Sequence, residues 1–572
     1  MLDIWRRCIQ GVLGLLAVSA ILPAQTASFI YQNEVATGAN PVALVLGNFT
    51  GNLLADLVVS QQGLGSVAML QSRGLGFFTQ PFPSQVTGQA PRMIGTGDFN
   101  RDGIPDLAVA NFGSGTVSLL LGNGDGTFRP FLSLEASSPS SLVVGDFNQD
   151  GLLDLAVCHQ AGNSVSIFLG NGDGTFRTAV DFAVGVGPVF IAAGDFNRDG
   201  IPDLAVANST SGSISILLGN GNGTFRTAVD FAAGSAPASL ALGDFNRDGM
   251  LDMAVVNDIS AGTVSLLIGS GNGSFQAPLS FPVGPNPSFV VAEDFNFDGN
   301  LDLAVANTGS DTVSILMGTG DRAFVPHLDF GVGNGPAWVL VTDFNADGKP
   351  DLVVANSLSN SLTMLANFTT IPNQPSIADR SVVNAASFLD GSVAPGEIVT
   401  IFGSNLGPAG TRVLFDGIPA TLLYAGNNQV SAIVPDGLAN QPKTLVAVEH
   451  NGIPSGTLTI PVAASAPGLF TATAGGTGQA AAQNQDLSIN SASNPAAPGS
   501  IVVLYGTGAG SPVLPVSVTV DGQAADVLYA GGTGVIQVNI QLPAGIHSGA
   551  AVPVVLRVGG AVSQPGVTLA VQ

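Results

Sequence analysis

The 572-residue sequence is poor in basic residues and cysteine. It has 16 Lys and Arg against 40 Asp and Glu, and its formal net charge is −24. Because phosphate binding needs clustered Lys and Arg, we expect no nucleic-acid partner. The two cysteines are Cys8 and Cys158, and Cys8 lies in an N-terminal segment that we expect to be removed, so no intrachain disulfide is predicted. Cys158 aligns with Ala110 and Ala207 of neighbouring repeats, and we expect it to be a buried small apolar residue.

The four histidines are scattered over different repeats and modules. His159, His327, His450 and His547 show no metal-binding pair spacing and no nucleophile-elbow motif. His159 occupies a strand-end position that other repeats fill with Asn, which predicts a surface polar residue. Glu293 precedes an acidic loop and is predicted to support it or to lie on the surface. We therefore predict no enzymatic activity, although a carboxylate pair assembled from several repeats remains an alternative.

Long apolar runs are absent except at the N-terminus. Arg6 and Arg7 precede an apolar stretch at residues 9–22, and small residues follow as far as Ala27. This order is typical of a signal peptide, predicted over residues 1–27, and the stretch is short for a membrane span. An uncleaved anchor is the alternative. With the signal removed we expect no membrane span, and a secreted or cell-surface protein.

Glycine and proline are abundant, with 75 and 35 residues, and they punctuate short apolar runs along the whole chain. This texture is typical of an all-β protein with many turns.

Nine-residue acidic loops recur in the first two thirds of the chain. The loop Asp-Phe-Asn-Arg-Asp-Gly-Ile-Pro-Asp at residues 195–203 has oxygen-bearing side chains at positions 1, 3, 5 and 9 and glycine at position 6. Calcium takes six to eight oxygen ligands, and alternate residues of a tight loop can all face it. Six loops keep every such position, which predicts up to six Ca²⁺ sites. The predicted ligands are Asp98, Asn100, Asp102, Asp106, Asp146, Asn148, Asp150, Asp154, Asp195, Asn197, Asp199, Asp203, Asp244, Asn246, Asp248, Asp252, Asp294, Asn296, Asp298, Asp302, Asp343, Asn345, Asp347 and Asp351.

A seventh copy, the first in the chain, has lost this pattern. It has Asn48, Thr50, Asn52 and Asp56, with Leu53 in place of glycine, so no metal is predicted there. Two questions stay open for the intact copies. The loops could be Asx-rich turns that need no metal, although three carboxylates within nine residues repel one another without a cation. A bound calcium could brace each repeat or bridge to a ligand.

The loops recur about every 50 residues, which indicates a tandem supersecondary unit. The sequence pattern of each unit predicts four short strands. The acidic loop lies between the first two strands, and a glycine-rich hairpin signal lies between the last two. Such units arranged radially form a β-propeller. The last unit lacks a fourth strand, whereas Phe29 lies 19 residues before Asn48, as Phe176 lies 19 before Asp195. We therefore predict seven blades over residues 28–368, with the N-terminal strand completing the last blade.

The units resemble FG-GAP/VCBS repeats, the blades of integrin α-chains and many exported bacterial proteins. The resemblance rests on Gly-Asp-Phe-Asn-x-Asp-Gly-x-x-Asp-Leu-Ala-Val at residues 97–109 and 194–206, and on Gly-Asn-Gly-x-Gly-Thr-Phe at residues 122–128 and 219–225. It implies the propeller fold and calcium loops, but leaves function open because one fold hosts many functions.

A Pro-containing linker at residues 369–376 leads to a second pair of repeats. We predict two immunoglobulin-like β-sandwich modules, at residues 377–467 and 468–572. Their shared pattern, Pro-Gly-x-x-Val, then Asp-Gly, then Tyr-Ala-Gly, resembles IPT/TIG domains. Tyr424 and Tyr529 occupy matching positions and are predicted to pack in the core or corner of each sandwich.

The composition favours binding over chemistry. We expect an exported calcium-binding protein that adheres, without catalysis, to a protein or glycan on a cell surface or matrix. Carbohydrate sites often stack sugars on Trp, and only Trp338 would remain in the mature chain, which disfavours a lectin. The alternatives are a polysaccharide-active enzyme on a propeller scaffold and a structural component of a cell-surface assembly.

Overall fold

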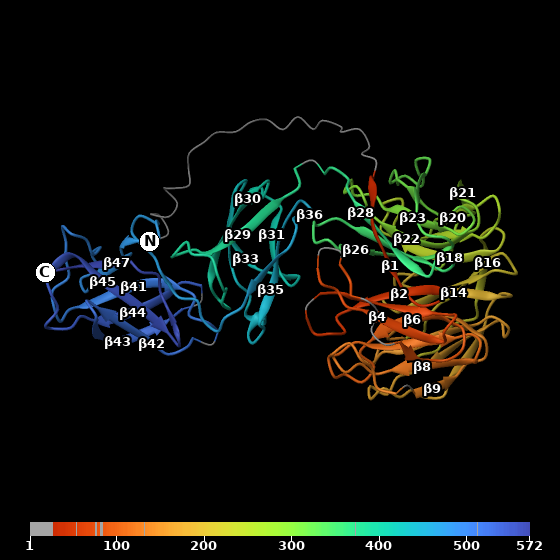
Figure 1. The fold of residues 1–572 in the computed structure, drawn as a ribbon, viewed down its shortest axis with the longest axis horizontal. Coiled ribbons are helices and arrows are strands. Elements are labelled where there is room, and N and C mark those ends of the chain that lie inside the picture. Colours follow the sequence, from red (N-terminus) through yellow and green to blue (C-terminus); the bar gives the residue numbers. More distant parts are fainter. Residues whose placement is uncertain are drawn as a thin grey trace.

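The computed structural model describes residues 27–572, apart from residues 53, 75–76, 80–83, 131, 372, 512 and 533. The predicted signal peptide therefore lies almost wholly outside the described residues. The described chain is all-β, with one short 3-10 helix, η1 (Asp436–Leu438). Among these residues, no helix is long and apolar enough to span a membrane. Figure 1 shows a large body of repeated sheets followed by two smaller ones.

Residues 29–367 form seven four-stranded antiparallel sheets. The first strands all begin with proline, which cannot donate a ladder hydrogen bond and is tolerated at a strand start. They are β2 (Pro41–Gly47), β6 (Pro91–Gly97), β10 (Pro139–Gly145), β14 (Pro188–Gly194), β18 (Pro237–Gly243), β22 (Pro287–Glu293) and β26 (Pro336–Thr342).

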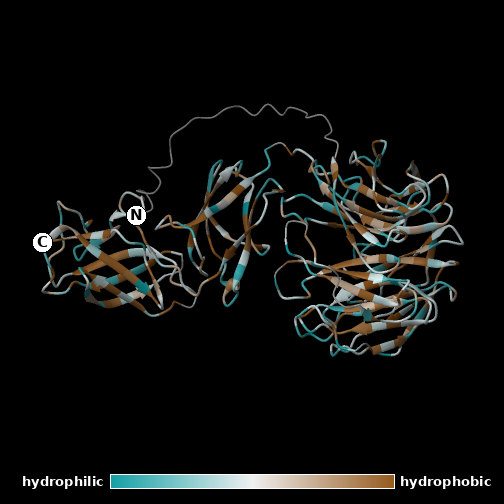
Figure 2. Ribbon diagram, viewed as in Figure 1, coloured by the Kyte–Doolittle hydropathy of each residue, from teal (hydrophilic) through white to brown (hydrophobic). Residues whose placement is uncertain are grey.

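The second strands each begin with the aspartate at position 9 of the acidic loop and are buried along their whole length. They are β3 (Asp56–Gln61), β7 (Asp106–Asn111), β11 (Asp154–His159), β15 (Asp203–Asn208), β19 (Asp252–Asn257), β23 (Asp302–Asn307) and β27 (Asp351–Asn356). Their apolar residues pack between neighbouring sheets, and Cys158 is buried among them, as predicted. Figure 2 shows hydrophobic residues along many strands of the repeated sheets, and loops of mixed hydropathy between them.

The third and fourth strands complete each sheet. The third strands are β4 (Ser66–Leu70), β8 (Thr116–Leu120), β12 (Ser164–Phe168), β16 (Ser213–Leu217), β20 (Thr263–Leu267), β24 (Thr312–Leu316) and β28 (Ser361–Asn367). The fourth strands are β5 (Gln85–Val86), β9 (Leu132–Glu135), β13 (Val180–Ala183), β17 (Val229–Ala232), β21 (Leu279–Pro282), β25 (Leu328–Gly331) and β1 (Phe29–Ala36).

The N-terminal strand β1 is the fourth strand of the last sheet. It pairs antiparallel with β28, with Phe29 opposite Asn367 and Ala36 opposite Ser361. The first strands contact one another in chain order from β2 to β26, and β26 contacts β2 again. The repeated sheets therefore follow a closed, propeller-like path, and the strand pairing predicted from the register of Phe29 is present.

Phenylalanine pairs join the first six sheets of the chain, each to the sheet that follows it. A phenylalanine at position 2 of one acidic loop meets the hairpin phenylalanine of the following sheet in an edge-to-face contact, for example Phe99 with Phe176 at 5.7 Å between ring centroids. The backbone N–H of Gly174 also donates to the carbonyl of Phe99. In the last sheet, Phe29 of β1 stands in place of the hairpin phenylalanine and contacts Phe295, with ring centroids 5.5 Å apart. The acidic loops are thereby held against the neighbouring sheet.

The first C-terminal body has two facing sheets, as in a sandwich. One contains β29 (Ser376–Asn384), β30 (Ile398–Ser404), β33 (Thr421–Gly426) and β34 (Gln429–Ile433). The other contains β31 (Thr411–Phe415), β32 (Ile418–Pro419), β35 (Lys443–His450), β36 (Ile453–Pro454) and β37 (Leu458–Pro461). Apolar residues from both sheets form one core.

The last body is a ten-stranded sheet folded around its own apolar core. Its strands are β38 (Gly468–Leu469), β39 (Gly478–Gln479), β40 (Ala482–Asn484), β41 (Ile501–Thr507), β42 (Val516–Val520), β43 (Gln523–Gly531), β44 (Ile536–Gln541), β45 (Gly549–Val558), β46 (Ala561–Val562) and β47 (Val567–Val571). Tyr529, which we expect in the core or corner of its sandwich, lies outside the core, because this side chain is 53% exposed. Its hydroxyl lies over Gly531, two residues along the same strand face, and Tyr424 and Gly426 repeat this arrangement.

Candidate functional sites: the acidic loops and an outer pocket

Each intact acidic loop is a tight turn in which side-chain oxygen atoms accept backbone N–H groups of the same loop. In the loop that follows β6, Asp98 accepts the backbone N–H groups of Asp102 and Gly103, at 3.0 and 2.8 Å. The side chain of Asn100 accepts the N–H of Asp102 at 2.9 Å and donates to its carboxylate. Arg101 and Gly103 have positive φ values of 61° and 81°, which bend the chain around these oxygens.

The aspartate at position 9 anchors the loop to the sheet. Asp106 is 0% exposed and accepts N–H groups from Phe99 at 2.9 Å and Gly122 at 2.8 Å. Burial raises its pKa to about 6 against the effect of these hydrogen bonds, and the nearby Asp102 and Asp98 add to the rise. Burial likewise raises the pKa at the matching positions, to about 6 for Asp203 and Asp252, about 8 for Asp302 and about 7 for Asp351.

The loop residues fit a hard divalent cation in their chemistry. Each loop offers three carboxylates, one amide oxygen and backbone carbonyls, which are the ligands that calcium takes. The pKa of Asp106 rises partly because of its two acidic neighbours, a repulsion that a cation would offset. Among the described residues, no three acidic or histidine side chains already converge as a metal cage. Their oxygens instead accept the N–H groups of the loop. Some neighbouring loops also contact each other, since Gln149 donates to the carbonyl of Gly200 and Arg247 donates to the carbonyls of Asp298 and Gly299.

The first copy satisfies its carboxylate in another way. Asp56 accepts the backbone N–H and the hydroxyl of Thr50 at 3.1 and 2.9 Å, and the N–H of Ser72 at 2.9 Å. Thr50 stands where the intact loops have asparagine, and the neutral Asn48 and Asn52 replace their acidic residues at positions 1 and 5. This copy has no comparable charge repulsion for a cation to offset.

Aromatic side chains meet at the centre of the repeated sheets. Trp338 on β26 stacks on Phe289 of β22 with ring centroids 3.7 Å apart. Phe289 also contacts Phe190 at 5.7 Å, although β18 lies between their strands in the ring. These three residues hold the same position in their strands, so their rings meet over the inner face of β18. Trp338 is thus engaged in packing.

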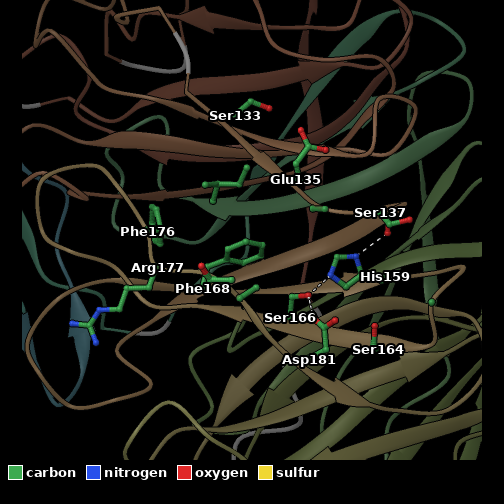
Figure 3. A pocket seen from close by; sticks show the side chains of 15 residues that line it. Ser133, Glu135, Ser137, His159, Ser164, Ser166, Phe168, Phe176, Arg177 and Asp181 are labelled. Carbon is green, nitrogen blue, oxygen red and sulfur yellow. Dashed lines mark hydrogen bonds between the residues drawn. The ribbon is translucent and has the colours of Figure 1, made fainter.

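A pocket of about 720 Å³ lies between the outer strands of two neighbouring sheets, and its lining includes Glu135, His159 and Asp181 (Figure 3). The prediction that His159 is a surface residue is wrong, because its side chain is only 6% exposed. The signal that could have revealed this is the asparagine at the same position of other repeats. Those asparagines are also buried, and they donate across to the third strand.

The ring of His159 links three elements. Its Nδ1 lies 2.8 Å from the carbonyl oxygen of Ser137, and its Nε2 lies 2.6 Å from the hydroxyl oxygen of Ser166. That hydroxyl donates to Asp181. A carbonyl only accepts, so Nδ1 faces Ser137 as a donor. Figure 3 shows the resulting chain of histidine, serine and carboxylate.

This chain differs from a hydrolytic triad, in which the serine proton goes to a neutral histidine. A neighbouring sheet builds the same chain without histidine: Asn208 donates to Ser215, and Ser215 donates to Asp230. His159 therefore replaces an asparagine in a structural hydrogen-bond relay, and the geometry offers no activated nucleophile.

Two family profiles match parts of this chain. A family profile described as an FG-GAP-like repeat matches five overlapping segments, at residues 98–157, 146–206, 195–255, 248–305 and 294–354. A profile described as an IPT/TIG domain matches residues 381–462. The chain thus contains FG-GAP-like repeats over residues 98–354 and an IPT/TIG domain over residues 381–462. The matched repeats contain all six intact acidic loops and leave out the first copy.

No curated protein matches this chain. Among solved structures, a functionally unknown protein from Desulfotomaculum acetoxidans is 14% identical, with a TM-score of 0.40 over 56% of this chain and 90% of that one. The periplasmic gluconolactonase of Pseudomonas aeruginosa is 18% identical, with a TM-score of 0.41 over 52% of this chain and 87% of that one. Similarities this low carry no argument about activity.

Proposed function

We propose that this protein is an exported calcium-binding protein that adheres, without catalysis, to a protein or glycan on a cell surface or matrix. Its repeats would form a seven-bladed propeller and its tail two immunoglobulin-like modules. The observation that carries the proposal is the recurrence of the intact acidic loop in six of the repeats. Each copy keeps an all-oxygen donor set around a buried aspartate whose ionised form is disfavoured without a cation. Extracellular calcium modules bind at about 10⁻⁴–10⁻³ M.

The packing at the centre supports binding over catalysis. A propeller enzyme on this scaffold would need a cleft with convergent acids. Here Trp338, Phe289 and Phe190 meet where the inner strands surround the axis. The outer pocket does contain Glu135 and Asp181. Asp181, however, accepts the hydroxyl proton of Ser166 and belongs to the structural relay.

The two ends of the repeated sheets carry different kinds of loops and turns. By the antiparallel order, the calcium loops and the glycine-rich hairpins share one end, and the turns between second and third strands share the other. Leu64 and Leu358 are exposed in two of those turns, on sheets that neighbour each other through β2 and β26. We place the adhesive surface at this second end, which leaves the calcium loops to brace the blades.

A binding screen tests the proposal. The mature protein would be applied to a glycan array and to extracted matrix, in millimolar calcium and in EDTA, with product analysis of bound polysaccharides. We expect calcium-dependent binding without cleavage. Released oligosaccharides would replace the proposal with the enzyme alternative. An intact fold that binds nothing but self-associates would favour the structural-assembly alternative.

A further inference from the structure

The last acidic loop, residues 343–351, differs from the other five in what lies against it. The backbone N–H of Thr457, just after β36 of the TIG domain, donates to the carbonyl of Ala346 at 3.3 Å. The side-chain amide of Gln374 donates to the carbonyls of Asp347 at 3.1 Å and Pro454 at 3.2 Å. Figure 1 places β36 at the side of the TIG domain that faces the repeats. The loop is therefore part of the joint between the two bodies.

The glycine at position 6 shows how close this approach is. A Cβ added to Gly348 would lie 2.6 Å from the carbonyl oxygen of Ser455. Gly456 makes the reciprocal approach, since its Cβ would lie 2.9 Å from the carbonyl oxygen of Ala346. At Gly200, the same position of another loop, an added Cβ meets nothing within 4 Å. Backbone of the TIG domain thus lies directly against this last acidic loop, which we call the seventh loop because the degenerate first copy is counted.

One oxygen of the buried carboxylate of this loop lacks a hydrogen-bond partner. In the other five loops, one oxygen of the position-9 aspartate accepts the N–H of the phenylalanine at position 2. Asp351 is 0% exposed, and its Oδ1 accepts the N–H of Asn367 at 2.7 Å. The backbone of Asn345 interacts with this carboxylate, but no hydrogen bond of normal geometry reaches Oδ2. An unpaired buried carboxylate oxygen is costly, which points to a missing cationic ligand.

We propose that calcium in the seventh loop fixes the orientation of the TIG domain on the repeats. The inference rests on the proposed calcium function and adds a role for one site. The carbonyls that accept from Thr457 and Gln374 belong to Ala346, which lies between two liganding positions, and to Asp347, which is itself a predicted ligand, so closing the loop around a cation would set their directions. Lys349 lies 3.9 Å from Asp347 within the same loop. Its charge would weaken cation binding, so this site should empty first as calcium falls.

Distances between two spin labels test the inference in the mature chain. The labels would be attached at Leu358→Cys, in a turn at the far end of the last sheet, and at Ile418→Cys on the TIG domain; both residues are exposed, whereas Cys158 is buried. We expect a narrow distance distribution in millimolar calcium and a broad one in EDTA. Calorimetry would count bound ions in parallel, with six expected.

The matched variants are Asp347→Asn in the seventh loop and Asp199→Asn in the loop with the open glycine. Each should bind five ions, but only Asp347→Asn should lose the calcium-dependent narrowing. Gln374→Ala, which leaves all ligands intact, should bind six ions and still show a broader distribution in calcium. If calcium binds but the wild-type distribution does not change, or if Asp199→Asn loses the narrowing equally, the inference is wrong. If no ion binds, the proposed calcium function fails with it.

Discussion

Calcium removal should lower the stability of the repeat body by an amount set by the number of intact loops. Mass action stabilises a native site by RT ln(1 + [Ca²⁺]/Kd), about 1.4 kcal/mol at a tenfold excess over Kd and about 2.7 kcal/mol at a hundredfold excess. Six independent sites would then contribute about 8 to 16 kcal/mol. With an unfolding entropy of about 2 cal/mol/K per residue, this corresponds to a Tm shift of roughly 10 to 20 °C for about 340 residues.

The assay is differential scanning calorimetry in 10 mM calcium and in EDTA. Asp199→Asn should reduce the calcium-dependent shift by about a sixth, because it disables one of six loops. Asp56→Asn in the first copy is the matched control: it removes a buried carboxylate that already has three hydrogen-bond donors. Its own Tm should fall in both buffers, with the difference between buffers unchanged. The reasoning is refuted if the wild-type shift is below about 2 °C, or if both variants reduce it equally.

Substitutions at three further residues have defined outcomes. Burial raises the pKa of Glu397 to about 8, above its unfolded value of 4.5. The contribution of Glu397 to stability is therefore full below pH 4.5 and is lost as the pH rises to 8. Glu397→Gln should flatten the pH dependence of the free energy of unfolding of the TIG domain, and an unchanged slope would contradict this. His159→Asn restores the common relay and should change the free energy of unfolding by less than about 1 kcal/mol, whereas His159→Leu should cost about 1–3 kcal/mol in urea titrations; equal costs would show that the relay is unimportant. Phe29→Ala removes a buried ring that contacts Phe295 and Phe330 at 5.5 Å each, and should cost about 3–5 kcal/mol with earlier release of β1 in hydrogen exchange; uniform exchange along β1 and β28 at wild-type rates would oppose it.

The repeat body was predictable because its signals are local and occur many times. The spacing of Phe29 and Asn48 predicted the pairing of β1 with β28, since a missing strand must match the register of the strands that the other units keep. The burial of Cys158 followed from alignment with alanine in other units. Repetition thus turns a weak single pattern into a specific one.

The failures concern side chains whose surroundings come from another element. The strand-end position of His159 predicts a surface residue, whereas its side chain is buried and its Nδ1 contacts the carbonyl of Ser137 in the segment between β9 and β10. The matching positions of Tyr424 and Tyr529 predict residues in the core or corner of each sandwich, whereas Tyr529 lies outside the core, along an exposed strand face over a glycine. The contact between Gly348 and Ser455 depends on how the linker folds back, and no repeat pattern encodes that path.

The separation of the two ends of the repeat body decides how an effect of calcium on adhesion should be interpreted. If a partner binds the turns near Leu358 while calcium binds at the other end, calcium cannot be a direct ligand bridge. Its removal would weaken adhesion only as far as it loosens the blades, so the loss of binding should follow the loss of stability as calcium is lowered. A bridging ion behaves differently, because it is a contact of the interface itself. Binding would then disappear when one loop is disabled by a substitution such as Asp199→Asn, even though five loops still stabilise the fold. The dependence of adhesion on single loops therefore separates bracing from bridging.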